Sequence, residues 1–125
     1  MQETAQEIEQ KLMRAHVNFR SLVESDYKST NLLEQYKYDL ARIETSTRGD
    51  IAKEKDPVTQ KPMFSNEALR EGELLIRLNS DEKYKQLLGM IGDIEDSLRE
   101  TRGQIEIHKN FMSTMKMCIE LRREV

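Results

Sequence analysis

An all-α fold is predicted by this sequence: a long antiparallel helical hairpin of coiled-coil type, with an irregular tip and a short connecting helix, that assembles as a homo-oligomer. Apolar residues recur at alternating steps of three and four along two long segments, as on one face of a helix. Charged residues make up 34% of the chain and tryptophan is absent, which suits surface-rich helices. Both prolines lie between the two segments. We expect one domain over residues 1–125.

The first long helix is expected over residues 3–46. Its apolar stripe runs from Ala5 to Ile43, and only Asp26 and Ser29 interrupt it. A heptad pattern kept over this length is typical of helices that pack side by side along a seam. The residues of this helix that we assign to the core or oligomer seam are Leu12, Phe19, Leu22, Leu33, Tyr36 and Leu40.

An irregular tip or connector is expected over residues 47–65, and a short helix over 66–78. The stretch "KDPVTQKP" is typical of a turn, because proline presets φ and the aspartate before it can cap the turn. Ser65 or Asn66 can begin the short helix, because both side chains can accept a hydrogen bond from a free backbone N–H. Gly72 weakens this helix.

The second long helix is expected over residues 81–123. Asn79 or Ser80 can cap its start, and Asp81 and Glu82 place negative charge in its first turn. Its stripe again follows steps of three and four. The residues of this helix that we assign to the seam are Ile91, Ile94, Leu98, Ile105 and Met112.

Polar residues interrupt both stripes at positions that an antiparallel pairing would bring together. Asp26 and Ser29 would then lie opposite the stretch from Thr101 to His108. We predict a polar layer there that sets the register of the helices, because buried polar groups can fix register at some expense in stability. His108 could also be a metal ligand or a base. The only other histidine is His16, however, and metal sites need several converging ligands, so we expect no metal.

Homo-oligomerisation is predicted from apolar residues outside the seam. A single hairpin covers one seam only, and the residues beside it would stay exposed to water in a monomer. Association is the usual way in which such surface is covered. These residues are Met13, Val17, Val23, Tyr27, Leu88, Phe111 and Cys118.

Several classes of protein are not expected. The single cysteine cannot form a disulfide within the chain, and no secretory segment or run of about 20 apolar residues is found, so we expect a cytoplasmic protein with no membrane partner. The sequence contains no phosphate-binding glycine loop and no nucleophile with an ordered base. We therefore expect no catalytic residues, no cofactor and no enzyme activity.

A local basic cluster is the candidate functional site. The net charge of −3 means that any attraction to phosphate must come from such a patch. The residues proposed to contact nucleic acid are Arg42, Arg48, Lys53, Lys55 and Lys61. Tyr36 and Tyr38 are close enough in sequence to offer a stacking surface for single-stranded nucleic acid, although Tyr36 falls in the seam. Acidic residues are interleaved with the basic ones, so the alternative is a solvated connector with local ion pairs.

The stretch "LARIETSTRGD" at residues 40–50 resembles a segment of the recombination mediators of T-even-type phages, the UvsY family. In that family a long N-terminal helix runs through an Ala-Arg-aliphatic-acidic segment into an Arg-Gly-Asp-like turn. Residues 80–82, Ser-Asp-Glu, are similar to the cap before the family's second long helix. Residues 102–105, Arg-Gly-Gln-Ile, followed by Lys109, are similar to a step within that helix.

The resemblance implies a phage-type DNA recombination accessory protein. Members of the family are small oligomers that bind single-stranded DNA and help to load a recombinase against a single-strand-binding protein. The implied partners are therefore single-stranded DNA, a recombinase, a single-strand-binding protein and further copies of the chain, in the cytoplasm of the host cell. In an oligomer, several weak tips would contact one DNA strand together.

Two alternatives without DNA binding remain open at this point. The chain could be a structural or interaction hairpin, such as a scaffold or a chaperone-like protein whose tips hold a client protein. It could also inhibit a host nuclease or polymerase through its acidic faces.

Overall fold

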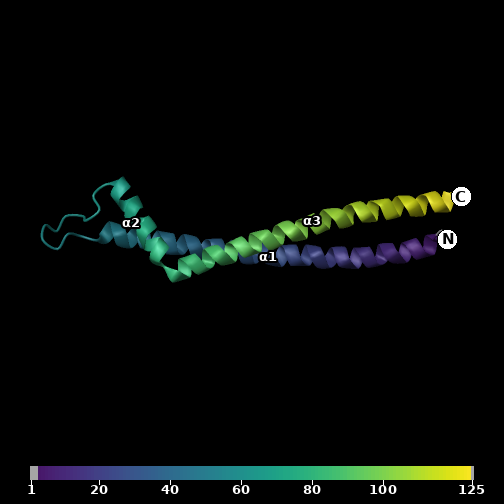
Figure 1. Ribbon diagram of the computed structural model, residues 1–125, viewed down its shortest axis with the longest axis horizontal. Helices are drawn as coiled ribbons and strands as arrows, with labels where there is room; N and C mark the ends of the chain where they lie inside the picture. Colours follow the sequence, from purple (N-terminus) through teal and green to yellow (C-terminus); the bar gives the residue numbers. More distant parts are fainter. Residues whose placement is uncertain (1–2, 125) are drawn as a thin grey trace. The chain divides into compact units, whose positions relative to one another are not determined.

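Three helices make up most of residues 3–124, the part of the chain that the computed structural model describes: α1 (Ala5–Lys53), α2 (Glu67–Ser80) and α3 (Glu82–Glu124) (Figure 1). No strand forms among these residues, apart from an isolated antiparallel bridge between Lys55 and Pro62. The three helices pack against one another, and the all-helical prediction is confirmed.

The described residues fall into two compact units. Unit 1 comprises residues 3–31 and 95–124, and unit 2 comprises residues 32–94. Both α1 and α3 run through the two units as continuous helices. The prediction of one domain over residues 1–125 stays a prediction, and residues 1, 2 and 125 lie outside the described part of the chain.

The first helix is longer than predicted, because α1 ends at Lys53 and not near residue 46. The prediction that residues 47–53 are irregular is therefore wrong. A helical glycine costs about 1 kcal/mol relative to alanine, whereas burial of an isoleucine side chain contributes about 1.5–3 kcal/mol. Ile51 is 2% exposed and packs in the core, so its burial outweighs the unfavourable Gly49. Arg48 and Lys53 consequently lie on a helix.

A compact turn follows α1, and its backbone is held by Asp56. The carboxylate of Asp56 accepts hydrogen bonds from the backbone N–H of Val58 (2.8 Å) and Thr59 (3.1 Å). The carbonyl of Asp56 accepts one from the N–H of Gln60 (2.9 Å). Gln60 adopts φ 59°, a left-handed conformation that helps the chain to reverse. The turn predicted from the Asp-Pro step is therefore present.

The short helix begins at one of the two predicted residues but ends later than predicted. Asn66 is the residue that begins α2, because its side chain accepts a hydrogen bond from the N–H of Leu69 (2.9 Å). The helix continues through Ser80, whose hydroxyl donates to the carbonyl of Ile76 (3.0 Å). Neither Asn79 nor Ser80 caps α3. That role belongs to Asp81, whose carboxylate accepts from the N–H of Tyr84 (3.0 Å).

The core of unit 2 brings all three helices together. Ile51 of α1 and two leucines of α2, Leu74 and Leu78, are buried in one cluster. Ile43 of α1 and Tyr84 of α3 pack against this cluster, as does Phe64. The Tyr84 hydroxyl donates to the carboxylate of Glu44 (2.9 Å). Burial, and then Glu44, raise the pKa of Tyr84.

Unit 1 is formed by one segment of α1 and one of α3. Asp26 pairs with Arg102 (2.9 Å) and Glu9 pairs with Arg123. The lower-numbered residue of α1 pairs with the higher-numbered residue of α3, so the two segments run in opposite directions within this unit. Its buried residues are Ile8, Ala15, Leu98, Met112 and Ile119.

All residues that we assigned to the seam are at least partly shielded from solvent. Ile91, Leu98 and Met112 are buried. The half-buried members are Leu12, Phe19, Leu22, Leu33, Tyr36, Leu40, Ile94 and Ile105. Alternating steps of three and four thus identify residues that face away from water along both long helices.

The polar residues of the stripes have different partners from those expected. Asp26 accepts hydrogen bonds from Arg102 Nε (2.9 Å) and from the hydroxyl of Thr30 (3.1 Å). The described hydrogen bonds link it to neither Thr101 nor His108. His108 Nδ1 instead lies 3.0 Å from the carbonyl oxygen of Gln104, one turn earlier in α3. A role of these residues in setting register stays a prediction.

Replacing Asp26 with asparagine should remove part of the acid sensitivity of the protein. The hydrogen bond from Arg102 lowers the pKa of Asp26 below its usual value. A carboxyl with a depressed pKa in the folded state contributes stability that is full above about pH 5 and is lost as the pH falls below about 4. Asp26→Asn should therefore be less stable than the parent at pH 7, and the difference should be smaller at pH 3, as measured by thermal unfolding. If the stability difference between the parent and Asp26→Asn were the same at both pH values, the Asp26 carboxylate would not contribute to the acid sensitivity.

Candidate nucleic-acid interface

The five basic residues predicted to contact nucleic acid all belong to unit 2, although they differ in their surroundings. Arg42, Arg48 and Lys53 lie on α1, and Lys55 and Lys61 lie on the turn between α1 and α2. All five are exposed. The structure separates them into a stacked arginine, three lysines without ion pairs among the described residues, and an arginine that is already paired.

Arg42 is stacked on an exposed aromatic ring. Its guanidinium carbon lies 6.0 Å from the ring centroid of Tyr38, one helical turn earlier in α1. Tyr38 is 62% exposed, whereas Tyr36 is half-buried as its seam position predicts. A cation beside an accessible ring combines a contact for phosphate with a surface on which a base can stack.

An open hollow of about 820 Å³ adjoins this pair. Its lining residues are Tyr38, Asp39, Ala41, Arg42, Ile43, Thr45, Ser46, Thr47, Asp50, Asp81 and Lys83. Lys83, from the first turn of α3, is a second cation at the hollow that the sequence did not point to. Among the acids, Asp81 is engaged in capping α3, and Asp39 accepts a hydrogen bond from Gln35 Nε2 (3.1 Å).

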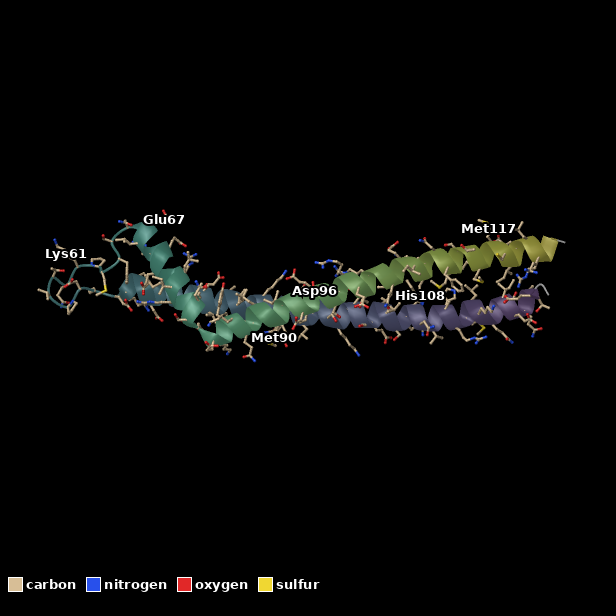
Figure 2. All side chains as sticks on the ribbon, viewed as in Figure 1. Lys61, Glu67, Met90, Asp96, His108 and Met117 are labelled. Atoms are coloured by element: carbon tan, nitrogen blue, oxygen red, sulfur yellow. The ribbon has the colours of Figure 1, made fainter. Side chains whose placement is uncertain are left out.

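Two of the three lysines lie on the turn that follows α1, and the third lies at the end of α1. Lys55 pairs with Pro62 in the antiparallel bridge, and the N–H of Asp56 donates to the carbonyl of Lys61 (2.8 Å). Lys55 and Lys61 therefore lie on neighbouring segments, and Lys53 is the last residue of α1. Lys61 is labelled in Figure 2. None of the three forms an ion pair within the described residues.

Arg48 is occupied by a carboxylate from α2. Its Nη1 donates to Glu71 Oε1, and its Nη2 donates to Glu71 Oε2 at 3.4 Å. The hydrogen bond from Arg48 lowers the pKa of Glu71, and the same contact raises the pKa of Arg48. In this conformation Arg48 makes an ion pair within the protein, which is the arrangement that the solvated-connector alternative describes.

A second arginine of unit 2 is also neutralised. Arg77 of α2 donates to Glu54 (2.6 Å) and to Glu73 (2.8 Å), and its guanidinium carbon lies 5.8 Å from the ring centroid of Phe64. These contacts connect α2 to the chain that leaves α1. Arg77 is therefore part of the structural support of the basic turn and not a free cation.

No group of three His, Cys, Asp or Glu side chains that could hold a metal ion occurs among residues 3–124. Within that range, none of the helices contains a stretch long and apolar enough to cross a membrane. Cys118 is a free, half-buried thiol on α3.

Two functional features could not be found from local sequence patterns. The pairing of Arg48 with Glu71 joins residues 23 positions apart on different helices. Lys83 likewise reaches the hollow from α3, whereas the other cation there is on α1. The position of Tyr38 outside the heptad stripe, by contrast, already indicated that its ring would be exposed.

The chain matches no family model, no curated protein and no solved structure.

Proposed function

We propose that this chain is a DNA recombination accessory protein of phage type that binds single-stranded DNA as a homo-oligomer in the cytoplasm and assists the loading of a recombinase. The observation that carries the DNA-binding part is the exposed Tyr38–Arg42 stack, followed along the chain by three exposed lysines without carboxylate partners among the described residues. The recombination role, with a recombinase and a single-strand-binding protein as partners, comes from the resemblance of residues 40–50 to the phage mediators.

Each group would contribute in its own way to binding. Tyr38 would stack on an unpaired base, which is possible for any base because each has a π face. Arg42 would contact a phosphate beside that base, and Lys53, Lys55 and Lys61 would contact phosphates further along the strand. Such a site favours single strands, since the bases of a duplex are already stacked on one another.

Oligomerisation would make this weak site effective. In this proposal the long helices form an antiparallel hairpin, a geometry that the Asp26–Arg102 pair in unit 1 supports. Met13, Val17 and Tyr27 are exposed on α1, as is Phe111 on α3, and this apolar surface supports association of copies. Several tips on one oligomer would then bind one strand with an avidity that no single tip has.

Changing Lys53, Lys55 and Lys61 together to glutamine should weaken binding and reduce its salt dependence. For single strands, each lost phosphate contact should flatten the plot of log K against log salt by about 0.7. The measurement is fluorescence anisotropy of a labelled oligodeoxythymidine.

A matched control has the same change of charge in unit 1: Lys28, Lys109 and Lys116 to glutamine, all exposed residues. This control should bind almost as the parent does. Equal loss of binding in both triple variants would show that net charge, and not the turn, governs binding.

A protein scaffold is the second candidate, and the outer face of α2 favours it. Leu69, Leu75 and Ile76 are exposed there, and Gly72 between them has no neighbouring atom that a side chain would meet. An exposed apolar face is typical of a surface that binds another protein. A scaffold without DNA binding would give no anisotropy change even at low salt.

A further inference from the structure

We propose that Glu71 competes with DNA phosphate for Arg48, so that α2 carries an intramolecular brake on the basic site. This inference rests on the proposed DNA binding and adds a regulatory contact to it. The two Nη atoms of Arg48 face the two carboxylate oxygens of Glu71. A phosphate group offers arginine the same arrangement, two oxygens for two parallel N–H donors. Glu71 therefore occupies the position that a phosphate would take.

The contact is accessible to an incoming strand. The side chains of Arg48 and Glu71 are 52% and 46% exposed. Ion pairs in water are weak, and a polyanion with many phosphates can replace a single carboxylate. Displacement requires no opening of the core, because only the two exposed side chains must separate.

Other carboxylates around Arg48 strengthen the brake. Glu44 of α1 and Glu67 of α2 act on Arg48 through their charges, in addition to the direct partner Glu71. Glu67 lies in the first turn of α2 (Figure 2). Arg48 is therefore held directly by a carboxylate, whereas Arg42 is stacked on the ring of Tyr38.

The position of α2 does not depend on this ion pair. Leu74 and Leu78 anchor the helix in the core, and Arg77 links it to Glu54. Loss of the Glu71 charge should therefore release Arg48 while α2 stays in place. Glu71 and Glu73 are both carboxylates of α2, yet Glu73 pairs with Arg77 and not with Arg48. This difference supplies a matched control.

The test compares Glu71→Gln, Glu73→Gln and the parent for binding of labelled oligodeoxythymidine at low salt. Glu71→Gln should bind about three- to tenfold more tightly and steepen the salt dependence by about 0.7, the contribution of one further phosphate contact to a single strand. Glu73→Gln, with the same change of net charge, should gain clearly less. Thermal unfolding of the two variants should show that both remain folded.

Arg48→Ala identifies the residue through which the effect acts. Introduced into the Glu71→Gln protein, this change should abolish the gain. The inference is overturned if Glu71→Gln binds no better than Glu73→Gln, or if its gain persists without Arg48. If neither the parent nor any variant binds at low salt, the proposed function is overturned together with this inference. If the parent binds and Glu71→Gln gains nothing over Glu73→Gln, only this inference is overturned.

Discussion

Leu74→Ala should lower the free energy of unfolding by about 2–5 kcal/mol, the usual range for removing a buried leucine side chain. Leu74 is 4% exposed and packs with Ile51 and Leu78, where α1 and α2 meet. Truncation leaves a cavity, since the surrounding helices can relax only in part. The loss is a large share of the roughly 5–15 kcal/mol by which domains are stable.

The neighbouring residue provides the control. Leu75 is 61% exposed, so Leu75→Ala should change the free energy of unfolding by no more than about 0.5 kcal/mol. Urea unfolding followed by circular dichroism at 222 nm measures both variants, because helix is the dominant structure of the described residues. Equal destabilisation by the two changes would show that α2 does not pack through Leu74.

Tyr38→Ala should weaken binding of single-stranded DNA about five- to a hundredfold, because stacking of one base on an aromatic side chain contributes about 1–3 kcal/mol. Arg42→Ala should also weaken binding and flatten the salt dependence by about 0.7, as expected for one lost phosphate contact to a single strand. Arg42 should matter more than Arg48 in the parent, because Arg48 is paired with Glu71 and Arg42 is not.

Two controls separate stacking and charge in this experiment. Tyr38→Phe keeps the ring and should bind as the parent does. Arg20→Ala removes the same side chain from an exposed position of α1 in unit 1 and should have little effect. If Tyr38→Ala binds as tightly as the parent, the stack has no part in DNA binding.

The long helices could be predicted from sequence because their signal is repeated many times. Each step of three or four adds to the same stripe, and the two interruptions in the first stripe, Asp26 and Ser29, do not change its period. The same repetition marks the residues that we assigned to the seam, which are buried or half-buried. The predicted cap of the second long helix, Asn79 or Ser80, was wrong, because Asp81 takes that role.

The end of α1 could not be predicted because a distant contact decides it. Gly49 and the charged residues around it are typical of a connector, yet Ile51 packs against Leu74 and Leu78. The apolar pattern within one segment does not show which other segment it packs against. The consequence for the site is direct, because an additional helical stretch places Arg48 opposite Glu71 of α2.

The residues of the candidate site could be predicted from the sequence, but their ion pairs could not. The basic residues and Tyr38 are recognisable in the sequence, and all of them are exposed. Which of the cations is free depends on carboxylates from other segments. Glu71 neutralises Arg48, whereas the turn built on Asp56 leaves Lys55 and Lys61 on neighbouring segments and without ion pairs among the described residues.

Binding of the unmodified protein to single-stranded DNA as a function of salt tests the central claim most directly. We expect clear binding of labelled oligodeoxythymidine at low salt, and an affinity that falls linearly on a plot of log K against log salt, because phosphate contacts release counterions. Absence of binding at low salt, where phosphate contacts are strongest, would contradict the account.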